Sequence, residues 1–375
     1  ALPARPPSVK QPNPSKMKPL SIVLRSVLPA LLTLSANIFG IQAVAQTWGC
    51  FTPPSDPPPP ELGLACGNSI EYAPLIPEQT PIKYCRIAFH VFQKDDGTGN
   101  FPNNSDGITY LTNLANTASN LMGQLDVLNL GVTSPYIQDS RIRLVLDAIY
   151  FHPHTSDWSY SNMNLMYTKY VINDNDGYGM TSDEKENVEH VFLSGNPTAP
   201  TGGRTYAYVS SGLFDGLGYQ GVINENGFYN HYLNNGPTSW SWGPVRNLVH
   251  ELCHSMSLSH NFQNCYYCPS TGAGPVNQCD VCSDNDPPGQ NCPDVGTSNN
   301  YMDYYPGGYN MSNPDPGLSA CQLGRMHYYL DGNAGTISRI VLQDHCTYDP
   351  TATITINQDV TWSGSKKLKG DLVID

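Results

Sequence analysis

Three stretches of the chain are short, apolar and rich in β-branched and aromatic residues. They are residues 82–92 (IKYCRIAFHVF), 141–151 (RIRLVLDAIYF) and 188–194 (VEHVFLS). Runs of this length and composition predict strands. A fourth run, residues 204–210 (RTYAYVS), predicts an edge strand. The sequence shows no internal repeat and no coiled-coil heptad.

Two other segments repeat their apolar residues at helical spacing. The first begins after Asn104-Ser105-Asp106, residue types that favour a helix start. Its apolar positions are Ile108, Leu111, Leu114, Ala115, Ala118, Leu121, Met122 and Leu125. The second segment has Pro244 at a first helical position, and its apolar positions are Val245, Leu248, Val249 and Leu252. A strand followed by an amphipathic helix is therefore expected, with another helix near residue 250.

The second helix runs into HELCHSMSLSH, residues 250–260. His250 and His254 are four residues apart on one helix face, with β-carbons about 5–6 Å from each other, so both can reach a zinc ion about 2.0–2.1 Å away. After the helix ends, His260 adds a third imidazole and leaves one position open, as in catalytic zinc sites. Glu251 lies beside this pair, where it can take a proton from a zinc-bound water.

The motif resembles the extended zinc motif of metzincin proteases, and more narrowly that of the pappalysin family, the cytophagalysin and ulilysin type. Two later segments match the same family: NNYMDY, which contains Met302, and LSACQLGRMHYYL, residues 318–330. By this resemblance, Met302 forms the Met-turn under the three histidines, and the Tyr304 phenol stabilises the oxyanion of the tetrahedral intermediate. The matches together cover about residues 79–349.

The resemblance implies an α/β (α+β) fold. Its N-terminal lobe has a twisted, mostly parallel sheet and the active-site helix, and its C-terminal lobe is irregular and rich in disulfides. In such enzymes the edge strand binds an extended protein or peptide substrate through backbone hydrogen bonds. The implied function is a secreted zinc metalloendopeptidase. The alternative is an inactive binding or adhesion protein with a metzincin fold, which would need neither Glu251 nor Tyr304. A zinc hydrolase with a non-peptide substrate leaves the Met302 match unexplained.

Two residues depart from the family motif. Ser257 stands where the family most often has glycine, at a point where the backbone commonly adopts positive φ. A left-handed serine costs about 1–2 kcal/mol, so strain is expected there. Cys253 replaces a small residue and lies on the flank of the face formed by His250 and His254, so a small buried thiol is expected rather than a fourth zinc ligand.

The N-terminal part of the chain has the pattern of an export signal. Residues 1–16 look like an upstream extension, and Met17 opens a short basic start. An interrupted apolar stretch, about residues 27–44, leads to Ala43-Val44-Ala45, an A-x-A cleavage pattern. A membrane anchor is the alternative, but it needs about 20 predominantly apolar residues. We therefore expect secretion, with an extension and signal peptide over 1–45 and a short pro-like segment over 46–78.

The catalytic domain is expected over 79–349, and residues 350–375 alternate like the start of a β-rich module such as those that follow catalytic domains in exported bacterial proteins. The oligomeric state is not indicated by any feature of the sequence.

Export makes disulfides the natural state of most of the 11 cysteines. Two C-x-x-C pairs, Cys265/Cys268 and Cys279/Cys282, resemble a zinc ribbon, but only ten residues separate them, and disulfides explain them more simply. Cys66 resembles the latency cysteine of pappalysin-like zymogens. If Cys253 is free, the other ten cysteines can pair completely, which favours a disulfide for Cys66 and leaves the latency role open.

Charge and acidic loops limit the partners further. A net charge of −13 disfavours nucleic acid and anionic membranes. Asp280, Asp284 and Asp286 lie where the pappalysin-like fold has an aspartate-rich calcium loop, and oxygen ligands suit calcium. An ordinary solvated turn explains them equally well. NDNDGYG, residues 173–179, has Ile172 where an EF-hand loop needs its first aspartate, so a surface turn is expected there.

Overall fold

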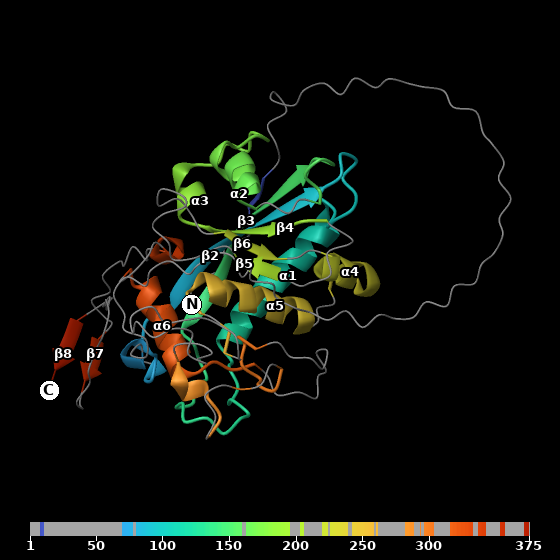
Figure 1. Cartoon of the computed structure of the whole chain (residues 1–375). Helices are drawn as coiled ribbons and strands as arrows, with labels where there is room; N and C mark the ends of the chain where they lie inside the picture. Colours follow the sequence, from blue (N-terminus) through green and yellow to red (C-terminus); the bar gives the residue numbers. More distant parts are fainter. Residues whose placement is uncertain are drawn as a thin grey trace, which may run out of the picture.

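A computed structural model describes sixteen ranges of the 375-residue chain. These are residues 8–10, 70–77, 80–159, 163–195, 203–205, 220–223, 226–238, 242–258, 260–261, 282–288, 293, 296–303, 316–332, 337–342, 353–356 and 371–374. Within them, a six-stranded sheet has helices on both of its faces (Figure 1). Among the helices described, none combines the length and the apolar character of a membrane span. The expected apolar signal stretch, about residues 27–44, lies outside them.

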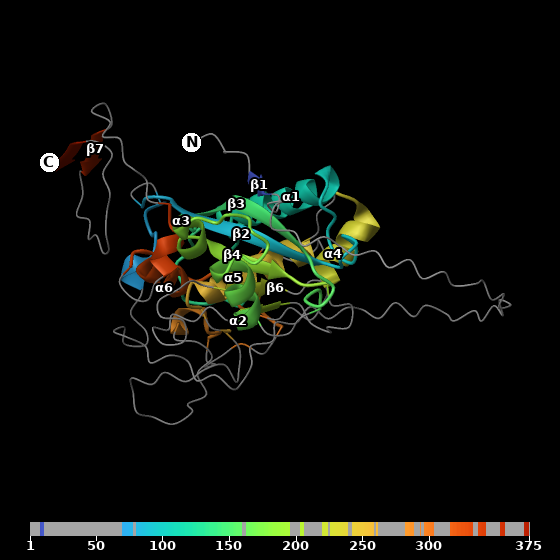
Figure 2. The same cartoon turned by 90° about the horizontal axis from the view of Figure 1, so that it is seen from above.

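The sheet has the strand order β1-β3-β2-β4-β6-β5. Most of this order can be followed across Figure 2. All neighbours are parallel except β5, which pairs antiparallel with β6. The strands are β1 (Ser8–Lys10), β2 (Lys83–Gln93), β3 (Ile142–Pro153), β4 (Glu189–Leu193), β5 (Gly203–Thr205) and β6 (Gln220–Ile223). The expected mostly parallel sheet and its three strands are confirmed, and the expected edge strand is confirmed over Arg204 and Thr205, since residues 206–210 lie outside the described ranges; β1 and β6 were not predicted.

Helices α1 (Ser105–Met122), α5 (Trp242–Ser255) and α6 (Ala320–Leu330) pack in one hydrophobic core with the lower face of the sheet (Figure 1). The Asn104 side chain accepts hydrogen bonds from the first turn of α1, as its sequence start predicts. Leu125 is buried beyond the end of this helix. Helix α5 begins two residues before Pro244, which therefore lies within the first turn, where a missing N–H is tolerated. Helix α4 (Asn226–Asn235) precedes α5.

The opposite face of the sheet is covered by a different layer. This outer layer consists of α2 (Met163–Met166), the π-helical segment η3 (Tyr167–Ile172), the loop that follows it, and α3 (Ser182–Glu186). Alternation along β2 separates the two faces: Ile87, Phe89 and Val91 belong to the core with α1 and α5, while Ala88 and Phe92 belong to a second core with the outer layer.

Shorter elements complete the described structure. They are η1 (Ile70–Tyr72), η5 (Ser283–Asn285), η6 (Ile337–Ile340), β7 (Thr353–Ile356) and β8 (Asp371–Ile374). Strands β7 and β8 pair in parallel. The boundaries proposed for the catalytic domain and its flanking segments stay predictions.

Candidate metal centre

Helix α5 and the chain that follows it bring three imidazoles together. The Nε2 atoms of His250 and His254 are 3.0 Å apart, and the Nε2 atom of His260 lies 3.2 Å and 3.1 Å from them. Zinc–nitrogen distances of about 2.0–2.1 Å in a tetrahedral site place ligand nitrogens about 3.3 Å from one another. The three nitrogens therefore lie close to the corners that a single zinc ion requires.

Backbone carbonyls fix the proton positions on two of these rings. His250 Nδ1 lies 2.5 Å from the carbonyl oxygen of Tyr301, and His254 Nδ1 lies 2.7 Å from that of Leu258. Because a carbonyl oxygen only accepts, each Nδ1 carries the proton and each Nε2 presents a lone pair. Lone pairs that face one another at about 3 Å repel unless a cation lies among them, so this donor set fits a metal ion.

The environment also keeps the rings in the neutral form that metal binding needs. Burial lowers the pKa of His254 to about 4. Burial, together with the neighbouring imidazoles, lowers the pKa of His250 and of His260 well below the ordinary value. At neutral pH the three imidazoles are thus uncharged and their Nε2 lone pairs are ready to coordinate.

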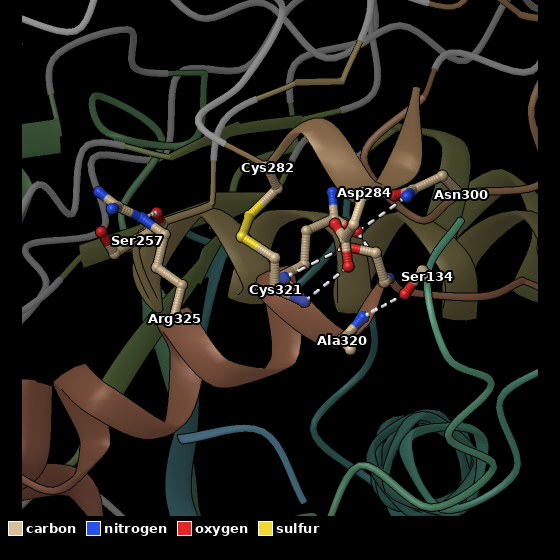
Figure 3. The surroundings of a disulfide bond; sticks show 10 residues. Ser134, Ser257, Cys282, Asp284, Asn300, Ala320, Cys321 and Arg325 are labelled. Atoms are coloured by element: carbon tan, nitrogen blue, oxygen red, sulfur yellow. Dashed lines mark hydrogen bonds between the residues drawn. A yellow bond between two sulfur atoms is a disulfide. The ribbon is translucent and has the colours of Figure 1, made fainter. Parts of the chain in front are cut away.

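The turn between the second and third histidines has the strained backbone that the sequence predicts. Ser257 has φ of +77°, in the left-handed region. The backbone N–H groups of Ser257 and Leu258 donate to the carbonyls of His254 and Cys253, at 2.9 and 3.0 Å, and close the helix. The guanidinium Nε of Arg325 on α6 donates to the Ser257 carbonyl at 2.7 Å, and Figure 3 shows the two side by side.

The segment that contains Met302 is bonded to both sides of the histidine cluster. Met302 is fully buried in the core shared by α5 and α6. The Tyr301 carbonyl accepts from His250, and the Met302 carbonyl accepts from the backbone N–H of Asn261, at 3.3 Å. The Asn300 side chain holds this turn, since its Oδ1 accepts from the Met302 N–H at 2.8 Å.

Two buried side chains that the sequence did not single out as supports stabilise the turn. Gln322 Oε1 accepts from Asn300 Nδ2 at 2.8 Å and from the N–H of Ser319 at 3.0 Å, as part of the capping box that starts α6. Arg246 on α5 donates to the carbonyls of Asn299 and Asn300, at 3.4 and 3.3 Å. Their sequence signal is weak, because only their position in the fold makes them supports.

The remaining expected active-site residues are placed in part. Glu251 is fully buried on α5, next to His250. Tyr304 lies outside the described residues, so its position stays a prediction. Cys253 is a buried free thiol, as expected, and burial raises its pKa, which disfavours the thiolate form that coordinates zinc.

A second buried free thiol changes the cysteine count. Cys85 on β2 is free, and burial raises its pKa to about 12. The expectation that all cysteines other than Cys253 can pair is therefore wrong. Of the 11 cysteines, two are free and Cys282 pairs with Cys321, which leaves 11 − 4 = 7, an odd number. Those seven, including Cys66, lie outside the described residues, and they cannot all pair among themselves.

The Cys282–Cys321 disulfide ties η5 to the start of α6 (Figure 3). A zinc ribbon that uses the Cys282 thiolate is excluded, because that sulfur is already bonded. Asp284 lies against the same helix start, where its Oδ2 accepts from the Cys321 N–H at 3.0 Å. Burial, with a smaller contribution from Asp284, raises the pKa of Asp286 to about 6. Asp280 lies outside the described residues, so the calcium site stays a prediction.

No protein-family model and no curated protein matches the chain. Among solved structures, it is similar to mature mirolysin of Tannerella forsythia in complex with a cleaved peptide. The TM-score is 0.41 and the sequence identity 15%, over 70% of this chain and 97% of that one. Mirolysin in complex with compound 9 gives a TM-score of 0.39 at 15% identity, with the same coverage.

Proposed function

We propose that this chain is a secreted zinc metalloendopeptidase that resembles the pappalysin-type metzincins. The observation that carries the proposal is the convergence of three Nε2 atoms within 3.0–3.2 Å of one another, two from helix α5, which also carries a buried glutamate, and one from the chain just after it. Carbonyl acceptors on the Nδ1 side of His250 and His254 support the same conclusion, since they hold these rings in the tautomer that zinc ligands adopt.

Each residue then has a defined role. His250, His254 and His260 would hold the zinc ion, which supplies Lewis acidity and makes water a stronger acid. Glu251 accepts the proton of the attacking water and passes it to the amine that leaves. Tyr304 donates a hydrogen bond to the oxyanion, and Met302 supports the histidines from the turn beneath them. A structural calcium ion at Asp280, Asp284 and Asp286 is part of the proposal.

The substrate proposed is a protein or peptide bound in extended form. Strand β5 is the last strand in the order of the sheet and runs antiparallel to β6. An extended peptide that pairs with such an edge strand presents its backbone to a nearby catalytic centre. Helix α5 contacts both β5 and β6, so the edge and the histidine-bearing helix pack together.

The second candidate function is binding or adhesion by a metzincin fold that has lost catalysis. The retained, buried Glu251 favours the enzyme, because a binding protein gains nothing from a carboxylic acid beside the metal ligands.

Casein cleavage by the zinc-loaded chain distinguishes the two functions. We expect chelation to abolish cleavage and Glu251→Gln to reduce it by roughly 100-fold or more, the usual contribution of a general base. Glu71→Gln, at an exposed position on η1, is the matched control and should cleave like the wild type. Equal cleavage by the Glu251→Gln variant and the wild type would reject the mechanism, and a zinc-loaded wild type without activity would favour the binding protein.

A further inference from the structure

Three buried imidazoles form a line across the sheet on the face opposite the candidate metal centre. His190 on β4, His90 on β2 and His152 on β3 are all fully buried. Strand register places His190 beside Ala88 and His152 beside Phe92, so the three rings step diagonally over neighbouring strands. His90 Nδ1 lies 2.9 Å from His152 Nε2, and His90 Nε2 lies 2.9 Å from His190 Nδ1. We call these three residues the imidazole chain.

Both ends of the imidazole chain meet the outer layer. At one end, His152 Nδ1 lies 2.6 Å from Asp176 Oδ2, in the loop between η3 and α3. The other oxygen of Asp176 lies 2.6 Å from Nε2 of the partly exposed His154. At the far end, His190 Nε2 faces the carbonyl oxygen of Lys185 on α3, at 3.3 Å. The imidazole chain thus runs across one face of the sheet, from the loop after η3 to α3.

The geometry is that of hydrogen bonds and not of a metal site. His90 uses its two nitrogens in opposite directions, so the three rings do not converge on one point. The planes of the His90 and His152 rings are parallel to within 2°, with centroids 5.1 Å apart. That separation is close to the nitrogen–nitrogen distance plus two ring radii, so the N–H bond of one ring points at the lone pair of the next. Within the part of the chain that the structure describes, the nitrogens of His90, His152 and His190 do not form a group that could hold one metal ion.

The protons available on the three rings fix the direction of the hydrogen bonds along the imidazole chain. The Asp176 carboxylate accepts, so His152 carries its proton on Nδ1 and offers Nε2 as an acceptor. His90 must then donate from Nδ1 to His152, and His190 must donate from Nδ1 to His90. Three neutral rings have three protons for four contacts, so the contact between His190 Nε2 and the Lys185 carbonyl is left without a hydrogen bond, and the imidazole chain is bonded to the outer layer at its Asp176 end. This contact is the longest of the four, as expected for the one without a proton.

The surroundings favour the neutral form of every ring in the chain. Burial lowers the pKa of His190 to about 4 and that of His90 well below the ordinary value. Burial also lowers the pKa of His152, although Asp176 opposes it. Asp176 itself is held ionised, because its hydrogen bonds to His152 and His154 outweigh its burial and lower its pKa.

Charged and titratable groups face the imidazole chain from every element that packs against it. The charged or titratable ones are Arg86 on β2, Tyr150 on β3, His154, Tyr167 and Tyr170 on η3, Asp174, Asp176 and Tyr178 in the following loop, and Glu184 on α3. Among them, Asp176 is the anion in direct contact with a ring of the chain.

We propose that the imidazole chain is an acid-sensitive lock that fastens the outer layer to the sheet while its three rings are neutral. Opening of the outer layer exposes the rings to water, where each takes up a proton below about pH 6.5. Mild acid therefore drives opening by mass action, and neutral pH restores the lock. The direction of the effect follows from linkage: stability is fully present above the unfolded pKa and is lost as pH falls toward the lower folded value.

Histidine-selective ¹⁵N NMR of the wild type tests the direction of the chain. At pH 7.5 we expect His90, His152 and His190 all to be neutral with the proton on Nδ1, with the rings assigned by through-bond correlation to the backbone of the wild type. The imidazole in water prefers the other tautomer, so three Nδ1–H rings are a specific signature. A ring of the chain with its proton on Nε2, or a ring charged at pH 7.5, would overturn the proposal.

The pH dependence of unfolding tests the lock. Each ring that is neutral when folded takes up a proton in the unfolded chain as the pH falls from 7.5 to 5. This uptake raises the equilibrium constant of unfolding by roughly 30-fold per ring. His90→Gln should therefore show a rise at least roughly 30-fold smaller than that of the wild type. The zinc-site histidines contribute equally to both proteins and cancel in this comparison. Identical pH dependence in the two proteins would refute the lock, and the NMR test on the wild type still decides the case if His90→Gln does not fold.

Discussion

Nδ1 of His250 donates a hydrogen bond to the carbonyl oxygen of Tyr301, 2.5 Å away, and so joins the histidine-bearing helix directly to the turn that contains Met302. The same turn accepts a hydrogen bond from Asn261, the residue after His260. One turn therefore helps to orient two of the three candidate ligands. Loosening it should affect metal binding as well as stability.

Removing Gln322, which supports the turn that contains Met302, tests whether this turn orients the zinc ligands. Gln322→Ala deletes a buried acceptor of the Asn300 side chain, and we expect it to destabilise the protein by about 1–3 kcal/mol. Zinc affinity, measured by competition with a chelator under native conditions, should fall as well. Gln124→Ala, at an exposed site just after α1, is the matched control. A less stable Gln322→Ala variant with unchanged zinc affinity would show that the turn does not orient the ligands.

The strained turn at Ser257 gives a second prediction. Ser257→Gly removes the side chain that disfavours positive φ, so we expect it to raise the free energy of unfolding by about 1 kcal/mol. Arg325→Met removes the donor to the Ser257 carbonyl and should weaken zinc binding. The loss should be smaller when both substitutions are combined, because glycine adopts the conformation without that support. A double-mutant cycle on zinc affinity measures this coupling, and strictly additive effects would contradict it.

Glu189 predicts a pH effect of the opposite sign to that of the imidazole chain. This fully buried carboxyl on β4 accepts a hydrogen bond from Ser255 Oγ at 2.8 Å, and no described donor reaches its Oε2. Burial raises its pKa to about 8. The unfolded chain releases the proton near pH 4.5 while the folded chain keeps it, so stability is lost as pH rises from about 4.5 toward 8.

Glu189→Gln should remove this loss. At pH 7.5 we expect the variant to be more stable than the wild type by on the order of 2–4 kcal/mol, with a much smaller difference at pH 4.5. Denaturant unfolding at the two pH values measures both differences. If Glu189→Gln lowers the free energy of unfolding equally at both pH values, Glu189 is ionised in the folded protein.

Local signals in the sequence predict the strands and helices well. Apolar runs mark β2, β3 and β4 to within about two residues, and the Asn104 cap marks the start of α1. Pro244 is a weaker guide, because proline is tolerated anywhere in the first turn, and α5 begins before it. Strand β1 comes from a segment remote in sequence, whose pairing with β3 no local pattern indicates.

The candidate metal ligands are equally local, since all three lie within eleven residues and their spacing encodes their geometry. No local motif predicts the imidazole chain. His90, His152 and His190 come from three strands far apart in sequence, and only the strand register brings them into line. Asp176 belongs to a segment expected to be a surface turn, yet its carboxylate is buried between two histidines. Contacts of this kind depend on the tertiary fold and leave no short motif.

The most direct test of the central claim is anomalous X-ray diffraction at the zinc absorption edge from crystals of the purified chain. The account predicts one strong anomalous peak about 2.0–2.1 Å from the Nε2 atoms of His250, His254 and His260. A crystal of zinc-treated protein with no peak between these three nitrogens, or with zinc bound only elsewhere, would contradict it.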